Sequence, residues 1–325
     1  MSPRYTGRVN VSVIIPVKDD ERVFACVESV LAAGARCDNV QILVVDNGSA
    51  PGFSEKLRAL PPGVELLQES KPGAYAARNR AIDAAAGDIV FFTDADCLVE
   101  PGWIAAGLRC IEGGADIAQG FSGSLGDAPV DRLIQRRYQA HLLALRPGGP
   151  TECDTRNLAV RRQVFERLRF NDHYRRVGDT EFGLVAEAMG YRVSYWPAMR
   201  VDHQHEREIA VFLAKQACHG WGAQRLMREH PEVVWHGGHL HLVAKMSRWS
   251  RRFPGQSATA RALCQLTIRT GRLLDRRAGR LPESVAVVAL AALDKGAALS
   301  GHLMHEAGAE EPAPSSLLGQ HHPRD

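Results

Sequence analysis

Two aspartates with one residue between them, Asp94 and Asp96, follow directly after the apolar run Ile89-Val-Phe-Phe92. If that run is a buried strand, the chain turns where it ends, and both carboxylates can approach a single cation. Hard carboxylate oxygens are the ligands that Mg2+ and Mn2+ prefer, and these ions keep open positions for phosphate oxygens. The pair therefore predicts a divalent-cation site serving a phosphate ligand. Taken alone, such a pair is more often a solvated turn, so the surrounding elements decide.

Alternating strands and helices surround the pair. Apolar runs at Val11–Pro16, Gln41–Val45 and Ile89–Phe92 predict buried strands, and helical spacing at Phe24–Ala33 and Ala74–Ala86 predicts helices between them. Almost wholly apolar strands in this order are typical of a parallel sheet covered by helices on both faces. The sequence therefore predicts an α/β fold with a mostly parallel central sheet.

Three polar clusters fall where predicted strands end. They are Lys18–Asp20, Asp46–Ser49 and Asp94–Asp96. In sheets of this kind, ligands bind at the carboxyl ends of the strands. The three clusters are therefore expected to form one site.

The composition of the 325-residue chain is that of an ordinary globular protein, and its formal net charge of +3 argues against general nucleic-acid binding. Its seven cysteines include no Cys-x-x-Cys pair and are odd in number, which favours a reducing cytoplasm. The N-terminus lacks the apolar stretch of a signal peptide. The longest apolar run, Val285–Leu293, is short of the roughly 20 residues that span a bilayer. A cytoplasmic protein without a membrane span is expected.

Several of these segments, in this order, resemble the motifs of the family 2 glycosyltransferases. The matching segments, within roughly residues 10 to 225, are Val11-Ser-Val-Ile-Ile-Pro16, Val44-Val-Asp-Asn-Gly-Ser49, Ala77-Arg-Asn79, Ala86-Gly-Asp-Ile-Val-Phe-Phe-Thr-Asp-Ala-Asp96, Thr155-Arg-Asn-Leu-Ala-Val-Arg-Arg162, Gly178-Asp-Thr-Glu181 and Val201-Asp-His203. The resemblance implies the GT-A fold, a nucleotide-sugar donor and inversion at the anomeric carbon.

By the same resemblance, a Mn2+ or Mg2+ ion would be held by Asp94, Asp96 and His203. Asp46 would accept a hydrogen bond from a uracil ring, beside the backbone of Pro16 and Val17. The other positions that match donor-binding positions of the family are Lys71, Gly73, Arg78, Asp94 and Asn157.

This chain departs from the family pattern at two places. The family often has a second acidic residue where this chain has Asn47. It commonly has Glu-Asp where this chain has Gly178-Asp179, with Glu181 two residues further on. Inverting transfer needs a carboxylate that takes a proton from the acceptor. Asp179 matches the family's catalytic base, and Glu181 is the alternative.

The chain is expected to divide into three parts. Residues 1–234 would form the GT-A domain, 235–306 a helical extension on the acceptor side or in a dimer, and 307–325 a disordered tail. The extension contains no comparable acidic or nucleophilic cluster, so a second enzyme is not expected there.

Together these observations predict a hexosyl- or N-acetylhexosaminyl-transferase. It would move a sugar from a UDP-sugar to a hydroxyl or amine acceptor, such as a small natural product or a carrier-bound intermediate. The alternatives are a non-catalytic protein that binds nucleotide sugars and a glycosyltransferase of cell-envelope glycans. A homodimer is left open, and the acceptor is not identified.

Overall fold

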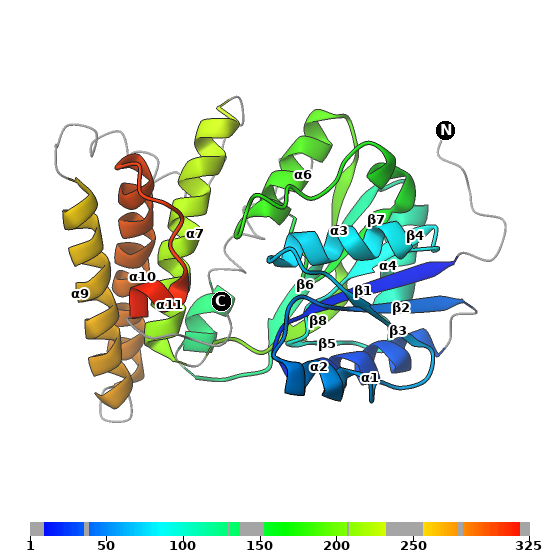
Figure 1. The fold of residues 1–325 in the computed structure, drawn as a ribbon, viewed down its shortest axis with the longest axis horizontal. Helices are drawn as coiled ribbons and strands as arrows, with labels where there is room; N and C mark the ends of the chain where they lie inside the picture. The colour runs from blue at the N-terminus through cyan, green and yellow to red at the C-terminus, as the bar shows by residue number, and fades with distance from the viewer. Residues whose placement is uncertain are drawn as a thin grey trace. The chain divides into compact units, whose positions relative to one another are not determined.

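The computed structural model describes residues 10–35, 39–128, 130–136, 153–206, 208–231, 256–277 and 282–318. The chain divides into two compact units (Figure 1). The sheet unit contains residues 1–123 and 151–204, and the helical unit contains residues 124–150 and 205–325.

Four parallel strands form one half of the sheet in the sheet unit. They are β1 (Val11–Val17), β2 (Val40–Asp46), β3 (Val64–Gln68) and β4 (Ile89–Phe92), in the order β3-β2-β1-β4. Every residue of β1 and β4 is buried, as expected for strands that are covered on both faces.

The other half of the sheet continues from β4 in the order β7-β6-β8-β5. These strands are β7 (Leu158–Arg161), β6 (Ile117–Ser124), β8 (Val193–His203) and β5 (Cys97–Val99). β7 is antiparallel to both β4 and β6, so β6 runs in the same direction as β1 and β4. The predicted α/β fold with a mostly parallel sheet is confirmed, although β5, β7 and β8 were not expected from the sequence.

Helices cover both faces of this sheet. α3 (Ala74–Ala84) and α6 (Gly178–Ala188) lie on one side, whereas α1 (Val23–Gly34) and α2 (Pro51–Leu57) lie on the other (Figure 1). α4 (Trp103–Glu112) packs into the same core as α1 and α2. A short 3-10 helix, η1, spans Arg162–Glu166.

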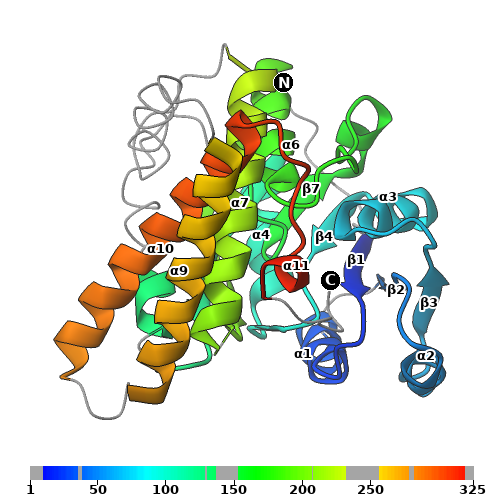
Figure 2. The same cartoon turned by 60° about the vertical axis from the view of Figure 1, so that its left-hand side comes forward.

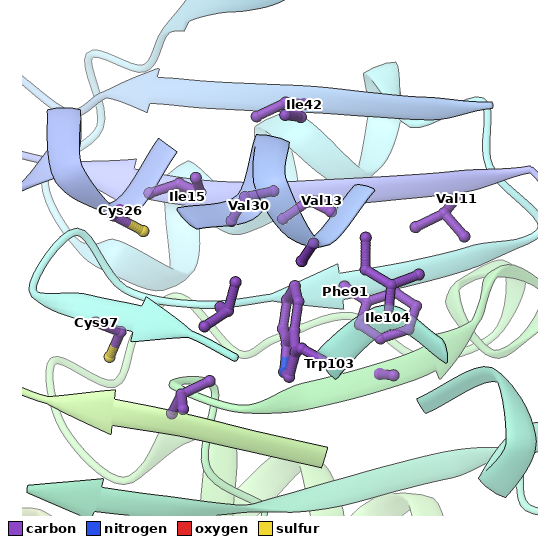
Figure 3. Packing of buried hydrophobic residues seen from close by; sticks show 14 of the residues in the cluster. Val11, Val13, Ile15, Cys26, Val30, Ile42, Phe91, Cys97, Trp103 and Ile104 are labelled. Atoms are coloured by element: carbon purple, nitrogen blue, oxygen red, sulfur yellow. The ribbon is translucent and has the colours of Figure 1, made fainter. Parts of the chain in front are cut away.

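The core beneath α1 and α4 is built from alternate residues of the parallel strands. Val11, Val13 and Ile15 of β1 point toward α1, as Figure 3 shows. Phe91 of β4 meets Trp103 of α4 edge to face, with ring centroids 4.9 Å apart. This packing fixes β1 and β4 relative to each other and so fixes the loops that follow them.

The helical unit is a bundle of long helices. α7 (Ile209–Glu229), α9 (Gln256–Arg277) and α10 (Glu283–Glu306) lie side by side in Figure 2, and the short helix α11 spans Pro314–Leu318. Backbones of α7 and α10 approach closely at glycines. A Cβ atom at Gly301 would lie 1.8 Å from the carbonyl oxygen of Ala217, so only glycine fits there.

Among the described residues, α10 is long and apolar enough over Ser284–Glu306 to cross a membrane. The core helix of a bundle can have the same length and composition, and 44% of this apolar stretch is buried. The sequence had shown only a shorter apolar run in this helix.

The unit boundaries differ from the expected domains. α7 belongs to the helical unit, although residues 1–234 were expected to form one domain. The expected start of the extension, residue 235, lies outside the described residues. Within the tail that was expected from residue 307, α11 buries Leu317 and Leu318, and Trp221 donates its indole N–H to the carbonyl of Ala309 at 3.0 Å. The rest of that tail, from residue 319, lies outside the described residues.

Candidate functional site

The residues that were predicted to bind the nucleoside lie where the parallel strands β1 and β2 end. β1 and β2 are in register with Pro16 beside Val45 and Val17 beside Asp46, so both strands end at the same level. The amide N–H of Asn47 donates to the carbonyl of Val17 at 2.9 Å and ties the two ends together. Pro16 and Val17 are buried and can offer only backbone at this edge.

Asp46 is buried and organises the turn that follows β2. Its carboxylate accepts the backbone N–H of Ser49 at 3.0 Å and the hydroxyl of Ser54 at 2.6 Å. The turn is held to the loop after β1 as well, because Ser49 accepts the N–H of Asp19 at 3.0 Å. The predicted nucleoside contact of Asp46 stays a prediction, and its role in the turn is an additional one.

Asn47 fastens the segment between β3 and α3 to the end of β2. Its side-chain amide donates to the carbonyls of Glu69 and Lys71 at 3.0 and 2.8 Å and accepts the N–H of Gly73 at 2.8 Å. A carboxylate could not make the two donations. The departure from the family pattern at this position is therefore explained by its contacts.

The predicted residues Lys71 and Gly73 lie in the segment that Asn47 holds. The Lys71 ammonium group is half exposed and lies 2.7 Å from a carboxylate oxygen of Asp172. Gly73 precedes α3 with φ of 124°, a backbone conformation that favours glycine. Both remain candidates for donor binding, because their segment borders the ends of β1 and β2.

The half-buried Asp94 forms an ion pair with the buried Arg78 of α3, with Arg78 Nη2 2.5 Å from Asp94 Oδ1. Burial raises the pKa of Asp94 above its ordinary value, although the Arg78 guanidinium opposes this shift. Arg78 itself is 3% exposed. In this arrangement Arg78 positions Asp94.

Asp96 and His203 are brought together by two strands that sequence patterns did not reveal. β5 pairs with β8 so that Cys97 lies opposite His203, and this places Asp96 Oδ2 3.3 Å from His203 Nε2. Arg22 Nη2 is 3.4 Å from the same carboxylate oxygen. Burial would raise the pKa of Asp96, but His203 and Arg22 outweigh it, and the net pKa is below the ordinary value. Asp96 is therefore ionised under ordinary conditions.

The atoms of Asp96, Cys97 and His203 that could hold a metal ion lie within 4.8 Å of one another. Carboxylate oxygen and imidazole nitrogen suit Mn2+, and carboxylate oxygen suits Mg2+. Burial raises the pKa of the Cys97 thiol well above its usual value, and thiolate is the form that binds metals. Asp96 and His203 are therefore the better pair of ligands.

Asp179 begins α6 and is held by donors from two other segments. Its Oδ1 accepts the hydroxyl of Tyr75 at 3.0 Å, and its Oδ2 accepts the N–H and hydroxyl of Thr155 at 3.2 and 3.3 Å. Asp179 is half-buried, whereas Glu181 is 7% exposed. Of the two candidate bases, Asp179 is the more accessible.

Adjacent residues link Asp179 to the cation side of the site. Thr155 contacts Asp179, and the Arg156 guanidinium lies 3.4 Å from His203 Nδ1. Arg156 also donates to both carboxylate oxygens of Asp154, at 2.5 to 3.0 Å.

Asn157 lies in the core of the sheet unit. Its side chain is fully buried and accepts the indole N–H of Trp103 at 2.8 Å. It donates to the carbonyls of Phe121 and Met199 at 2.7 and 2.9 Å. Both amide N–H groups and the amide oxygen are engaged in the core, and the expected contact with the donor stays a prediction.

Several residues that contact the predicted site residues were not themselves predicted from the sequence: Arg22, Tyr75, Asp154, Thr155 and Arg156. Thr155 and Arg156 belong to a segment that already matched the family, and Tyr75 lies one helical turn before Arg78. Because they lie next to residues that match the family motifs, their place in the candidate site could have been predicted. Arg22 lies two residues after the polar cluster Lys18–Asp20 and donates to Asp20, so its position was a signal as well.

Comparison with known proteins gives a consistent result. The family model for glycosyl transferase family 2 matches residues 12–169. Glycosyltransferase AglE of Haloferax volcanii is 30% identical over 197 residues, which cover 57% of this chain and 64% of that protein. The chain spans less than two thirds of the length of the curated relatives that it matches.

Two solved structures share the fold at low sequence identity. The mannosyltransferase PcManGT from Pyrobaculum calidifontis, in complex with GDP-Man and Mn2+, has a TM-score of 0.62 at 18% identity, covering 95% of this chain and 90% of that chain. Glucosyl-3-phosphoglycerate synthase from Mycobacterium tuberculosis, in complex with Mg2+ and UDP, has a TM-score of 0.50 at 19% identity, covering 68% and 79%. Both are similar to this chain in fold.

Proposed function

We propose that this protein, whose residues 12–169 match the model of glycosyl transferase family 2, transfers a sugar from a UDP-sugar to a hydroxyl or amine acceptor, with inversion at the anomeric carbon. The observation that carries the proposal is the bridge formed by Thr155 and Arg156. These adjacent residues contact Asp179 and His203, so a candidate base and a candidate cation ligand belong to one continuous site.

The donor side of the proposed site combines three groups of residues. Asp96 and His203 would hold a divalent cation, with Asp94 beside them, and such an ion would neutralise the charge that develops on the departing diphosphate. Pro16, Val17 and Asp46 would border the uridine. Lys71, Gly73 and Arg78 complete this side: Lys71 and Gly73 lie in the segment before α3, and Arg78 holds Asp94 in place.

The acceptor side of the proposed site contains Asp179. Inverting displacement requires the base to lie on the opposite side of the sugar from the leaving diphosphate. Asp94 and Asp96 belong to the proposed cation site and so cannot be the base. Asp179 would accept the acceptor's proton as the new bond forms. The longest of its contacts, the 3.3 Å contact with the Thr155 hydroxyl, is the one that an acceptor hydroxyl would replace.

The first experiment measures UDP binding by calorimetry with Mn2+ or with chelator, and UDP release from a panel of UDP- and GDP-sugars. The variant Asp96→Asn is expected to lose cation-dependent binding and to reduce turnover by about 10²-fold, because it removes stabilisation of the leaving group. The control is Glu55→Gln, which alters an exposed ion pair on α2. Equal UDP affinity with and without the ion would eliminate the cation site. A preference for GDP-sugars would correct the donor.

The second experiment addresses the base. Asp179→Asn is expected to lower transfer by about 10²–10⁴-fold while UDP affinity stays near the wild-type value. If Asp179→Asn is active and Glu181→Gln is inactive, Glu181 is the base. Determining the anomeric configuration of the product by NMR tests inversion, and retention would contradict it. The acceptor class, a cytoplasmic location and a homodimer stay predictions that an acceptor screen, fractionation and light scattering address.

A further inference from the structure

Tyr75 of α3 contacts the start of α6 through its hydroxyl group. The hydroxyl donates to Asp179 Oδ1 at 3.0 Å and accepts the backbone N–H of Gly178 at 3.0 Å. Tyr75 is 6% exposed and its bond with the Gly178 N–H is buried, whereas the carboxylate of Asp179 is half-buried. The hydroxyl therefore holds both the candidate base and the backbone immediately before it.

The ring of Tyr75 is fixed by its neighbours on several sides. It stacks on Phe170 with ring centroids 5.9 Å apart, and the Arg78 guanidinium lies 5.4 Å from its centroid. A Cβ atom at residue 178 would lie 2.7 Å from the ring, so Gly178 leaves the space that Tyr75 fills. The family commonly has a glutamate at this position, and the tyrosine ring excludes one in this chain.

The direction of the hydrogen bond between the two side chains follows from their surroundings. Burial raises the pKa of Tyr75 well above its usual value, and the negative charge of Asp179 adds to this shift. The phenol therefore keeps its proton and donates it to the carboxylate. A proton donor on Oδ1 and the Thr155 donors on Oδ2 together restrict rotation of the carboxylate.

We propose that Tyr75 is a positioning residue for Asp179: its hydroxyl sets the orientation in which the carboxylate receives the acceptor's proton. This inference rests on the proposed role of Asp179 as the base. α3 then serves both sides of the reaction, since Arg78, one turn further along, holds Asp94. In this role Tyr75 acts through Asp179 and takes no direct part in the chemistry.

The test is Tyr75→Phe in the full chain, which removes the hydroxyl and keeps the ring against Phe170 and Arg78. Transfer kcat is expected to fall about tenfold or more, with donor KM and UDP affinity close to wild type. The melting temperature should fall as well, because the buried N–H of Gly178 loses its acceptor. In the Asp179→Asn background, adding Tyr75→Phe should have no further effect on kcat. The matched control is Tyr195→Phe, which removes the hydroxyl of a half-buried tyrosine on β8 and should leave kcat unchanged.

A second variant keeps the proposal testable if Tyr75→Phe folds poorly. Gly178→Ala retains the Tyr75 hydroxyl but displaces the ring, and it should also lower kcat more than it changes donor KM. Wild-type kcat in Tyr75→Phe, with Asp179→Asn inactive, would overturn the positioning role while leaving the base in place. Equal losses from Tyr75→Phe in both backgrounds would also overturn it, since the effect would be independent of Asp179. Full activity of Asp179→Asn would remove the base itself and the inference with it.

Discussion

At the scale of one residue, the side-chain amide of Asn47 donates two hydrogen bonds that a carboxylate could not donate. Asn47→Asp would lose both donations to the carbonyls of Glu69 and Lys71 and would place a negative charge against them. The free energy of unfolding is expected to fall by about 1–3 kcal/mol, the cost of unpaired buried polar groups. UDP affinity should fall too, because the segment before α3 is released. Urea denaturation and calorimetry measure both effects, with the exposed Asn39→Asp as control; wild-type values for Asn47→Asp would contradict the prediction.

Asp154 gives a prediction about pH at the same scale. Burial would raise the pKa of Asp154, but its bonds with Arg156 outweigh burial, and the net pKa is lowered. A carboxyl whose pKa is lower in the folded state stabilises the fold above its unfolded pKa of about 3.9 and loses that contribution as pH falls through the folded pKa. Asp154→Asn should therefore cost about 1–3 kcal/mol at pH 7 and less below about pH 4. Unfolding free energies measured from pH 3 to 7 test this, and a constant difference would refute it.

At the scale of elements, the contact between α4 and β4 depends on the absence of a side chain. A Cβ atom at Gly107 would lie 2.4 Å from the Phe91 ring and 2.8 Å from the sulfur of Met199. Gly107→Ala is expected to destabilise the sheet unit by about 1–3 kcal/mol through overpacking. Gly102→Ala, at the start of the same helix with no atom within 4 Å, is the matched control. Similar denaturation midpoints for the two variants would be inconsistent with this packing.

The helices and strands also show which parts of the candidate site can be predicted from sequence patterns. β1, β2 and β4 are continuous apolar runs followed by polar turns, so their ends, with Asp46 and Asp96, were predictable. β5 has three residues, and β8 contains Pro197 within an exposed stretch, so neither carries a strand pattern. The geometry that places His203 against Asp96 comes from the pairing of those two strands, and only the family resemblance pointed to His203.

Asn157 shows a related limit of sequence patterns. Its partners Trp103, Phe121 and Met199 come from α4, β6 and β8, which are far apart in the sequence. A polar residue in a matching motif was interpreted as a ligand contact, yet here it satisfies buried groups of three separate elements. No local pattern distinguishes these two roles.

At the scale of the whole molecule, the two units can be tested separately by substitution in the full chain. Gly301→Ala places a Cβ atom against the backbone of α7 and should destabilise the helical unit by at least about 1–3 kcal/mol. UDP affinity should stay within about threefold of wild type, because the proposed donor residues lie in the sheet unit. Gly296→Ala, on the same helix and 3.4 Å from the nearest atom, is the control. Loss of UDP binding in Gly301→Ala alone would show that the units are not independent.

The bridge formed by Thr155 and Arg156 constrains any effort to redesign substrate scope. A single peptide bond joins the residue that contacts Asp179 to the residue that lies beside His203. A backbone shift at these two residues that enlarges the proposed acceptor side therefore also moves the proposed cation side. Mutant libraries aimed at new acceptors should therefore leave residues 154–157 unchanged and vary solvent-exposed positions in neighbouring segments, where a change in shape does not alter the spacing between the two halves of the chemistry.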